Sequence, residues 1–252
     1  MNRDATMSGA GVREDPVLQG FLRELSEAAG TRLKSVVLYG SAARGDFIRK
    51  ASDLNLIVVV EPLDPATLEA VAPCFRRFTK AGHPVPRLFS PGLIKASADS
   101  FPIEFLEIRS SGLVLAGADL FAGVPIRREC LRLQCERELK EKLMRLREGY
   151  LLCHDNPREL RRLLIGSYPA FAALFRGGLH LMGRQVPASS AAVMAAFCEA
   201  AGLDGAPFDE VARLRQGQDA TEDPKRIFAG YHDRLTRAAH HVDGLDTGGD
   251  TP

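Results

Sequence analysis

Residues 36–60, VVLYGSAARGDFIRKASDLNLIVVV, contain the features that decide how this chain is interpreted. The run Ser35–Tyr39 predicts a β-strand that ends at Gly40, because Val, Leu and Tyr favour extended backbone and glycine interrupts it. The run Leu54–Val60 predicts a second strand, and its continuous apolar character is typical of a strand that is buried on both faces. The stretch therefore predicts two core strands whose connection carries polar residues.

The connection after the first strand has the composition of a phosphate-binding turn. Gly40 has no side chain, so a ligand can approach its backbone closely. Ser41 stands where a helix can begin, and the N–H groups of a helix start can face a phosphate. Arg44 follows within one turn, and Gly45 allows the chain to leave again. We predict that Gly40, Ser41 and Arg44 bind phosphate; the alternatives are an ordinary strand-to-helix turn and, for Arg44, a solvent-facing ion pair.

A polar group is predicted beside this turn. Asp53 and Asn55 are two residues apart at the start of the second strand, so their side chains project from the same face. The run Phe101–Ile108, FPIEFLEI, predicts a third strand, in which Glu104 and Glu107 would face opposite sides. If that strand lies beside Asp53, one glutamate completes a cluster with room for Mg²⁺, as phosphoryl or nucleotidyl transfer requires. Taken alone, Asp53 could equally cap a turn.

With these features in this order, residues 20–120 resemble the DNA polymerase β-like nucleotidyltransferase superfamily, in particular its bacterial minimal and aminoglycoside nucleotidyltransferase-like branch. The family pattern is G-S-x-x-x-G, a spacer, then (S)D-x-D on a strand and a third carboxylate on a later strand. Here it reads GSAARG at 40–45 and SDLN at 52–55. The resemblance implies a fold with a mixed sheet and flanking helices. It also implies Mg²⁺ or Mn²⁺ as cofactor and a nucleoside triphosphate as substrate, whose monophosphate is transferred to an acceptor hydroxyl while pyrophosphate leaves.

Carried over residue by residue, the resemblance implies that Asp53, Asn55 and Glu104 are the catalytic and metal-binding residues. It favours Glu104 over Glu107 because family members place the third carboxylate early in its strand. The family's second aspartate is Asn55 here, and a neutral amide offers a metal one carbonyl oxygen where a carboxylate offers two charged ones. Two functions follow: a transferase with a weakened site, or a non-catalytic nucleotide-binding or partner-binding protein of the toxin–antitoxin type. A purely structural module, with the motif spacing accidental, is a third reading.

The rest of the chain predicts an α+β protein, with a nucleotidyltransferase-type mixed sheet followed by an all-helical bundle. Strand and helix patterns alternate up to about residue 124, and helical patterns alone follow. We predict a flexible tail at 1–14, a nucleotidyltransferase-like domain at 15–124, a helical bundle domain at 125–245 and a tail at 246–252.

Composition limits the setting of the protein. The chain has 33 Lys and Arg against 32 Asp and Glu, and this balance argues against nucleic-acid binding by bulk charge. No apolar run reaches the roughly 18 residues of a membrane span, and the N-terminal residues lack the apolar core of a secretory signal. The five cysteines form no C-x-x-C pair, and the histidines show no zinc spacing. We predict a cytoplasmic protein with reduced, buried thiols; a homo-oligomer is left open.

The segment Arg127–Arg147 is rich in charged residues, and three further arginines follow at 158–162. The plain interpretation is a solvated helix face with ion pairs four residues apart. The other is that some of these cations meet a triphosphate or an anionic acceptor. Tyr150, His154, Tyr168 and Phe171 could supply a stacking surface, although a core role is favoured for them.

Overall fold

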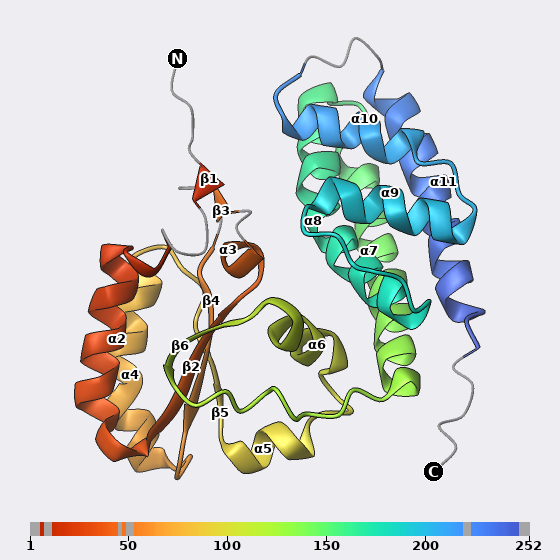
Figure 1. The fold of residues 1–252 in the computed structure, drawn as a ribbon. Coiled ribbons are helices and arrows are strands. Elements are labelled where there is room, and N and C mark those ends of the chain that lie inside the picture. Colours follow the sequence, from red (N-terminus) through yellow and green to blue (C-terminus); the bar gives the residue numbers. More distant parts are fainter. Residues whose placement is uncertain (1–5, 8–11, 45–46, 49–52, 219–222, 247–252) are drawn as a thin grey trace. The chain divides into compact units, whose positions relative to one another are not determined.

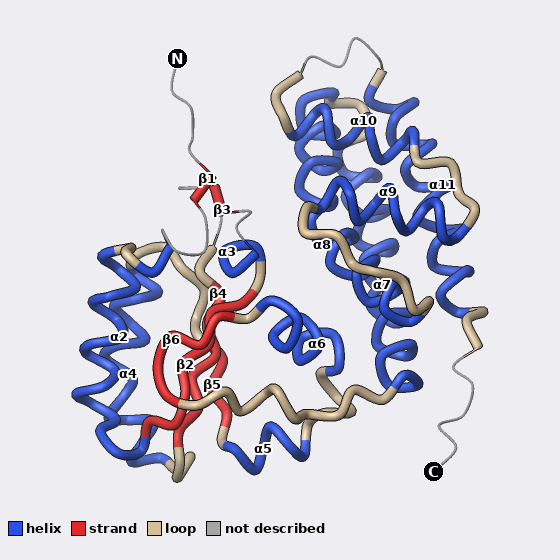
Figure 2. The backbone as a smooth tube through the Cα atoms, in the orientation of Figure 1, coloured by secondary structure: helices blue, strands red, loops and turns tan. Residues whose placement is uncertain are grey.

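The computed structural model describes residues 6–7, 12–44, 47–48, 53–218 and 223–246. The chain divides into two compact units, residues 1–126 and 127–252. The described part of the first unit is mixed α/β, and that of the second is helical (Figures 1 and 2). The α+β fold class is therefore confirmed. Much of the predicted N-terminal tail, nearly all of the C-terminal tail and Gly45 lie outside the described residues.

The first unit contains, in chain order, β1 (Thr6–Met7), α2 (Pro16–Ala29), a 3₁₀ turn (Gly30–Arg32), β2 (Leu33–Tyr39), α3 (Ser41–Arg44), β3 (Phe47–Ile48), β4 (Asn55–Val60), α4 (Pro65–Lys80), β5 (Arg87–Phe89), α5 (Pro91–Ala96), α6 (Pro102–Ser111) and β6 (Leu113–Gly117). The strands predicted at Ser35–Tyr39 and Leu54–Val60 correspond to β2 and β4. Helix α2 begins at Pro16, because the Asp15 carboxylate accepts hydrogen bonds from the N–H groups of Val17 and Leu18.

The central sheet has the strand order β5-β4-β2-β6. Strand β2 is antiparallel to both β4 and β6, whereas β5 runs parallel to β4. The short strands β1 and β3 form a separate antiparallel pair. Because β2 and β4 are antiparallel neighbours, the C-terminal end of β2 lies beside the N-terminal end of β4, and the polar residues predicted at these two ends meet at one edge of the sheet.

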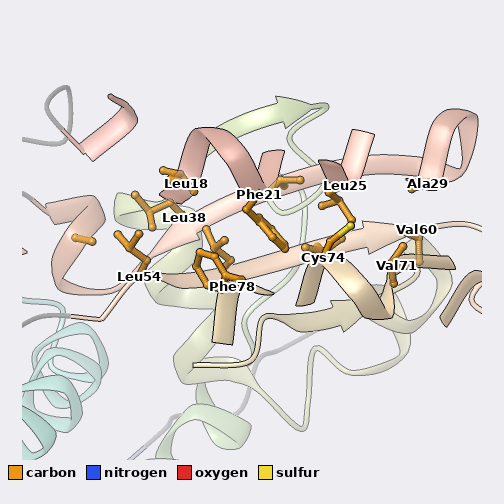
Figure 3. Close-up of a cluster of buried hydrophobic side chains, with 14 of the residues drawn as sticks. Leu18, Phe21, Leu25, Ala29, Leu38, Leu54, Val60, Val71, Cys74 and Phe78 are labelled. Carbon is orange, nitrogen blue, oxygen red and sulfur yellow. The ribbon is translucent and has the colours of Figure 1, made fainter. Parts of the chain in front are cut away.

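The two faces of the sheet bury different side chains. Val36, Leu38 and Val58 belong to one core cluster with apolar residues of α2 and α4, and Figure 3 shows Leu38 among them. Val37 and Ile57, at the alternate positions, join Phe89 and residues of α6 in a second cluster on the opposite face. This alternation places Tyr39 and Asn55 on the α6 face, since they continue the odd-numbered positions of β2 and β4.

The prediction of a strand at Phe101–Ile108 is wrong, because this run forms α6. Its most buried side chains are Pro102, Phe105 and Ile108, which are three residues apart and so share one helix face. Pro102 also occupies the first turn of the helix, where its missing N–H costs nothing. Glu104 and Glu107 therefore lie on one side of a helix and not on opposite sides of a strand.

The second unit consists of α7 (Arg128–Cys153), α8 (Pro157–Leu181), α9 (Ser190–Ala201), α10 (Ala206–Arg215) and α11 (Pro224–Asp243). Ion pairs four residues apart cover α7, including Arg132–Glu136, Lys140–Glu136 and Lys142–Glu138, as the plain interpretation of its charges predicts. The core role is confirmed for Tyr168 and Phe171, which are buried, but it is wrong for His154, which is exposed, and Tyr150 is half-buried.

Two further expectations concern the whole described chain. All five cysteines are free thiols, and each is buried or half-buried. Among the helices that the structure describes, none combines the length and the apolar character that crossing a bilayer requires.

Candidate functional site

The candidate site lies at the edge of the sheet where β2 ends and β4 begins. Tyr39 and Asn55 are directly paired across these two antiparallel strands. Gly40 follows Tyr39, and Asp53 precedes Asn55 by two residues and is exposed to solvent. The structure thus brings together the predicted Gly-Ser turn and the predicted Asp-x-Asn pair, which are separated in the sequence by a loop that is only partly described.

Gly40 has a backbone conformation that side chains disfavour and a neighbour that leaves no room for one. Its φ is +81°, in the region where only glycine is unstrained. A Cβ atom on Gly40 would lie 3.0 Å from Nδ2 of Asn55. The Asn55 amide therefore sits directly against the backbone of the turn, within reach of a ligand that approaches this glycine.

The turn after Gly40 is closed by local hydrogen bonding. The N–H of Arg44 donates to the Gly40 carbonyl at 3.2 Å, and Ser41 opens the single turn α3. Ala42 is fully buried in the core cluster shared with α2 and α4, so the turn is anchored to the unit beneath it. The first N–H groups of a helical turn have no carbonyl partner within that turn, which makes them available to an anion.

We expect Gly40→Ala to weaken nucleotide binding and to lower the free energy of unfolding by about 1–2 kcal/mol, because alanine is strained at positive φ. Denaturant unfolding and calorimetric titration with ATP measure the two effects. Gly20→Ala is the control, since Gly20 lies inside α2 with open space around it and alanine favours helices. Equal ATP affinity in Gly40→Ala and the wild type would contradict a close approach of ligand to this turn.

Strand β5, which pairs with β4, carries the cation Arg87 opposite Ile57. The sequence instead predicts that a strand beside Asp53 carries the carboxylate of Glu104. The Arg87 guanidinium pairs with the Glu104 carboxylate on α6, with Nη1 and Oε1 3.0 Å apart. The Arg87 side chain is 47% exposed and that of Glu104 is 19% exposed. Glu104 thus reaches the candidate site from a helix and is engaged by an arginine.

Arg44 and Glu107 form a second pair of the same kind. Nη1 of Arg44 donates to Oε1 of Glu107, and both side chains are mostly buried. Arg44 thus forms an ion pair, but a mostly buried one and not the solvent-facing pair of the alternative interpretation, and its contact with phosphate stays a prediction. Both glutamates of α6 are neutralised by arginines from other elements of the unit, one from α3 and one from β5.

Tyr39 lies close to the pair formed by Arg87 and Glu104. Burial raises the pKa of its phenol, and the Arg87 charge opposes this shift only in part. The Tyr39 hydroxyl therefore keeps its proton at neutral pH and can donate a hydrogen bond. Neither Tyr39 nor Arg87 is predicted as a site residue. The signal for Tyr39 is its place directly before Gly40, whereas Arg87 becomes visible only once β5 is known to lie beside β4.

The donor set of the site fits one Mg²⁺ ion that arrives with a triphosphate. Asp53 offers a carboxylate just before β4 and Asn55 a carbonyl oxygen at its first position, and Mg²⁺ commonly takes one or two protein oxygens, the phosphates and water. Within the described ranges, no group of three or more His, Cys, Asp or Glu side chains is placed to hold a metal. The proposed third ligand, Glu104, is held by Arg87. The site does not fit a pair of bridged metal ions.

The comparisons with known proteins concern the fold. No protein-family model and no curated protein matches the sequence. Among solved structures, the chain is similar to spectinomycin adenyltransferase AAD(9) from Enterococcus faecialis, determined with ATP and spectinomycin. The two share 12% sequence identity with a TM-score of 0.53, over 86% of this chain and 98% of the other. The fold is therefore nucleotidyltransferase-like.

Proposed function

We propose that this protein binds a nucleoside triphosphate at the edge of the sheet formed by Gly40, Ser41, Asp53 and Asn55, and transfers its nucleoside monophosphate to an acceptor hydroxyl. The observation that carries this proposal is the contact between the Gly40 turn and Asn55, with Asp53 on the same edge. A turn that admits phosphate and a carboxylate that can hold its counterion are thereby adjacent. The nucleotidyltransferase-like fold, and the ATP bound by the similar AAD(9), support the choice of ligand.

In this proposal each residue has a role set by its chemistry. The backbone of the Gly40 turn and the Ser41 hydroxyl bind phosphate oxygens, and Asp53 and Asn55 hold Mg²⁺. Bound Mg²⁺ would neutralise the triphosphate and polarise the phosphate under attack. Asn55 can also donate from its amide nitrogen, which an aspartate cannot do. The Tyr39 phenol and the Arg87 guanidinium are the further donors at this edge.

A second candidate function is binding of a nucleotide or a protein partner without catalysis, as in a toxin–antitoxin pair. Two observations favour it: Asn55 replaces an acid, and both glutamates of α6 pair with arginines. The acceptor that the transferase would use is a small molecule or a protein that remains to be identified. We also propose a cytoplasmic location, for which the free thiols are the supporting observation.

The two functions are separated by measuring binding and turnover on the same protein. Calorimetric titration with ATP, with and without Mg²⁺, tests binding. A pyrophosphate-release screen over the four nucleoside triphosphates and several acceptors, with Mg²⁺ and Mn²⁺, tests transfer. Release that depends on an acceptor supports the transferase. Saturable binding without release supports the second function, and no binding contradicts both.

Asp53→Ala is expected to remove the Mg²⁺-dependent part of ATP binding without lowering the thermal midpoint. Asp53 is exposed and its carboxylate is the charged ligand of the proposed ion, so its loss affects the ligand and not the core. The comparison is calorimetric titration at fixed ATP with and without Mg²⁺, beside a thermal melt of the free protein. Asp99→Ala, an exposed aspartate in the same unit, is the control. A large drop in the midpoint of Asp53→Ala would make Asp53 a structural residue.

A further inference from the structure

The helical unit contains a groove between α7 and α8 that opens over a short distance. At one end the two helices touch: a Cβ on Gly149 would lie 2.6 Å from Cδ1 of Leu163. One turn further along α8, a Cβ on Gly166 would have no atom within 4 Å. A cavity of about 410 Å³ lies at this point, within the range of small-molecule sites in proteins.

The floor of the groove is apolar and well packed. Leu163 and Ala170 of α8 line it and are half-buried, and they lie above Leu146 and Phe171, which are 2% and 1% exposed and belong to the core beneath. Phe171 packs edge-on against Tyr231 of α11, at 6.1 Å between ring centroids, which holds its ring in place. A flat apolar or aromatic group is the occupant that such a floor favours.

The rim of the groove is cationic. Lys142, Arg145 and Arg162 line it, and none of the residues found to line it is an aspartate or a glutamate. The acids that pair with two of these cations belong to their own helices: Glu138 lies 3.5 Å from Lys142, and Glu159 lies 2.6 Å from Arg162. Arg145 has no ion pair within 4.0 Å among the residues that the structure describes. The positive charge at the rim is therefore balanced only in part.

We propose that this groove binds a small aromatic anion, with the ring on Leu163 and Ala170 and the anionic group among Lys142, Arg145 and Arg162. Guanidinium and ammonium groups bind carboxylate, sulfonate and phosphate through charge-assisted hydrogen bonds. A neutral aromatic molecule would contact the apolar floor but would form no ion pair with the rim. A cationic molecule would be repelled by the rim. This site is independent of the nucleotide proposed for the first unit.

The test uses the full-length chain with two fluorescent probes, anilinonaphthalene sulfonate and the neutral N-phenyl-naphthylamine. We expect the sulfonate to bind one saturable site. The double variant Arg145→Gln with Arg162→Gln should lower the affinity for the sulfonate about tenfold or more, because two charge-assisted contacts are lost. The neutral probe should bind weakly and equally to both proteins. Arg137→Gln is the matched control, since Arg137 also lies on α7 but does not line the groove.

Gly166→Leu is the second variant, and it fills the open space while favouring the helix. It should block the sulfonate with no loss of thermal midpoint. A second apolar cavity, between α4 and β5, includes Leu68 and must be distinguished from the groove. Leu68→Glu should leave sulfonate binding unchanged. Binding that survives Gly166→Leu, or that Leu68→Glu abolishes, would overturn the proposal.

Discussion

Ser41→Trp is expected to abolish ATP binding while the protein keeps its fold. Ser41 is half-exposed at the start of α3, directly after Gly40, the glycine of the proposed phosphate-binding turn. An indole at this position fills the space that the triphosphate needs, whereas removal of the hydroxyl alone, in Ser41→Ala, costs only about 1 kcal/mol for one hydrogen bond. Calorimetric titration with Mg²⁺ and ATP measures both variants.

The control for this prediction is Ser26→Trp, which places the same bulk on the exposed face of α2. It should bind ATP like the wild type. A circular-dichroism melt checks that both tryptophan variants are folded. Wild-type affinity in Ser41→Trp would remove residues 40–44 from the binding site and would leave the proposed function without its phosphate-binding element.

Asn55→Asp is expected to raise pyrophosphate release about tenfold or more, equivalent to roughly 1.4 kcal/mol in the barrier. The substitution adds a carboxylate two residues from Asp53, and opposite charges in contact near a protein surface attract by about 4 kcal/mol before desolvation is subtracted. The double variant Asn55→Asp with Arg87→Glu replaces a cation with an acid on the neighbouring strand β5 and removes the ion pair between Arg87 and Glu104. It should bind Mg²⁺ more tightly still.

Asn156→Asp is the matched control, because Asn156 caps α8 with its side chain and aspartate caps equally well. It should change neither metal binding nor turnover. Tighter metal binding without turnover in Asn55→Asp would support the non-catalytic function. A fall in an activity that the wild type already has would show that the site is built around the amide.

The sequence predicts the strands and the turn of the candidate site well, because their signals are local. The apolar run that becomes β4 and the glycine that ends β2 are read directly from neighbouring residues. The start of helix α2 is a local signal of the same kind, because an aspartate cap followed by proline leaves little choice of starting point. The structure brings the end of β2 and the start of β4, which these local signals predict, together at one edge of the sheet.

The third carboxylate could not be predicted in the same way. FPIEFLEI contains apolar residues at spacings of both two and three, so its periodicity fits a strand as well as a helix. The structure resolves this in favour of α6, whose Phe105 and Ile108 fill the second core cluster. Both Glu104–Arg87 and Glu107–Arg44 join residues far apart in the chain. Pairs of this kind follow from the tertiary fold and leave no local sequence signal.

Hydrogen–deuterium exchange on the full-length protein, with and without Mg²⁺ and ATP, tests most directly whether a nucleotide binds at this edge of the sheet. If the nucleotide binds there, we expect slower exchange in the peptides that contain residues 39–44 and 53–56, and no such change in Ser41→Trp. Protection confined to the helical unit, around the groove between α7 and α8, would place the nucleotide elsewhere and contradict the account.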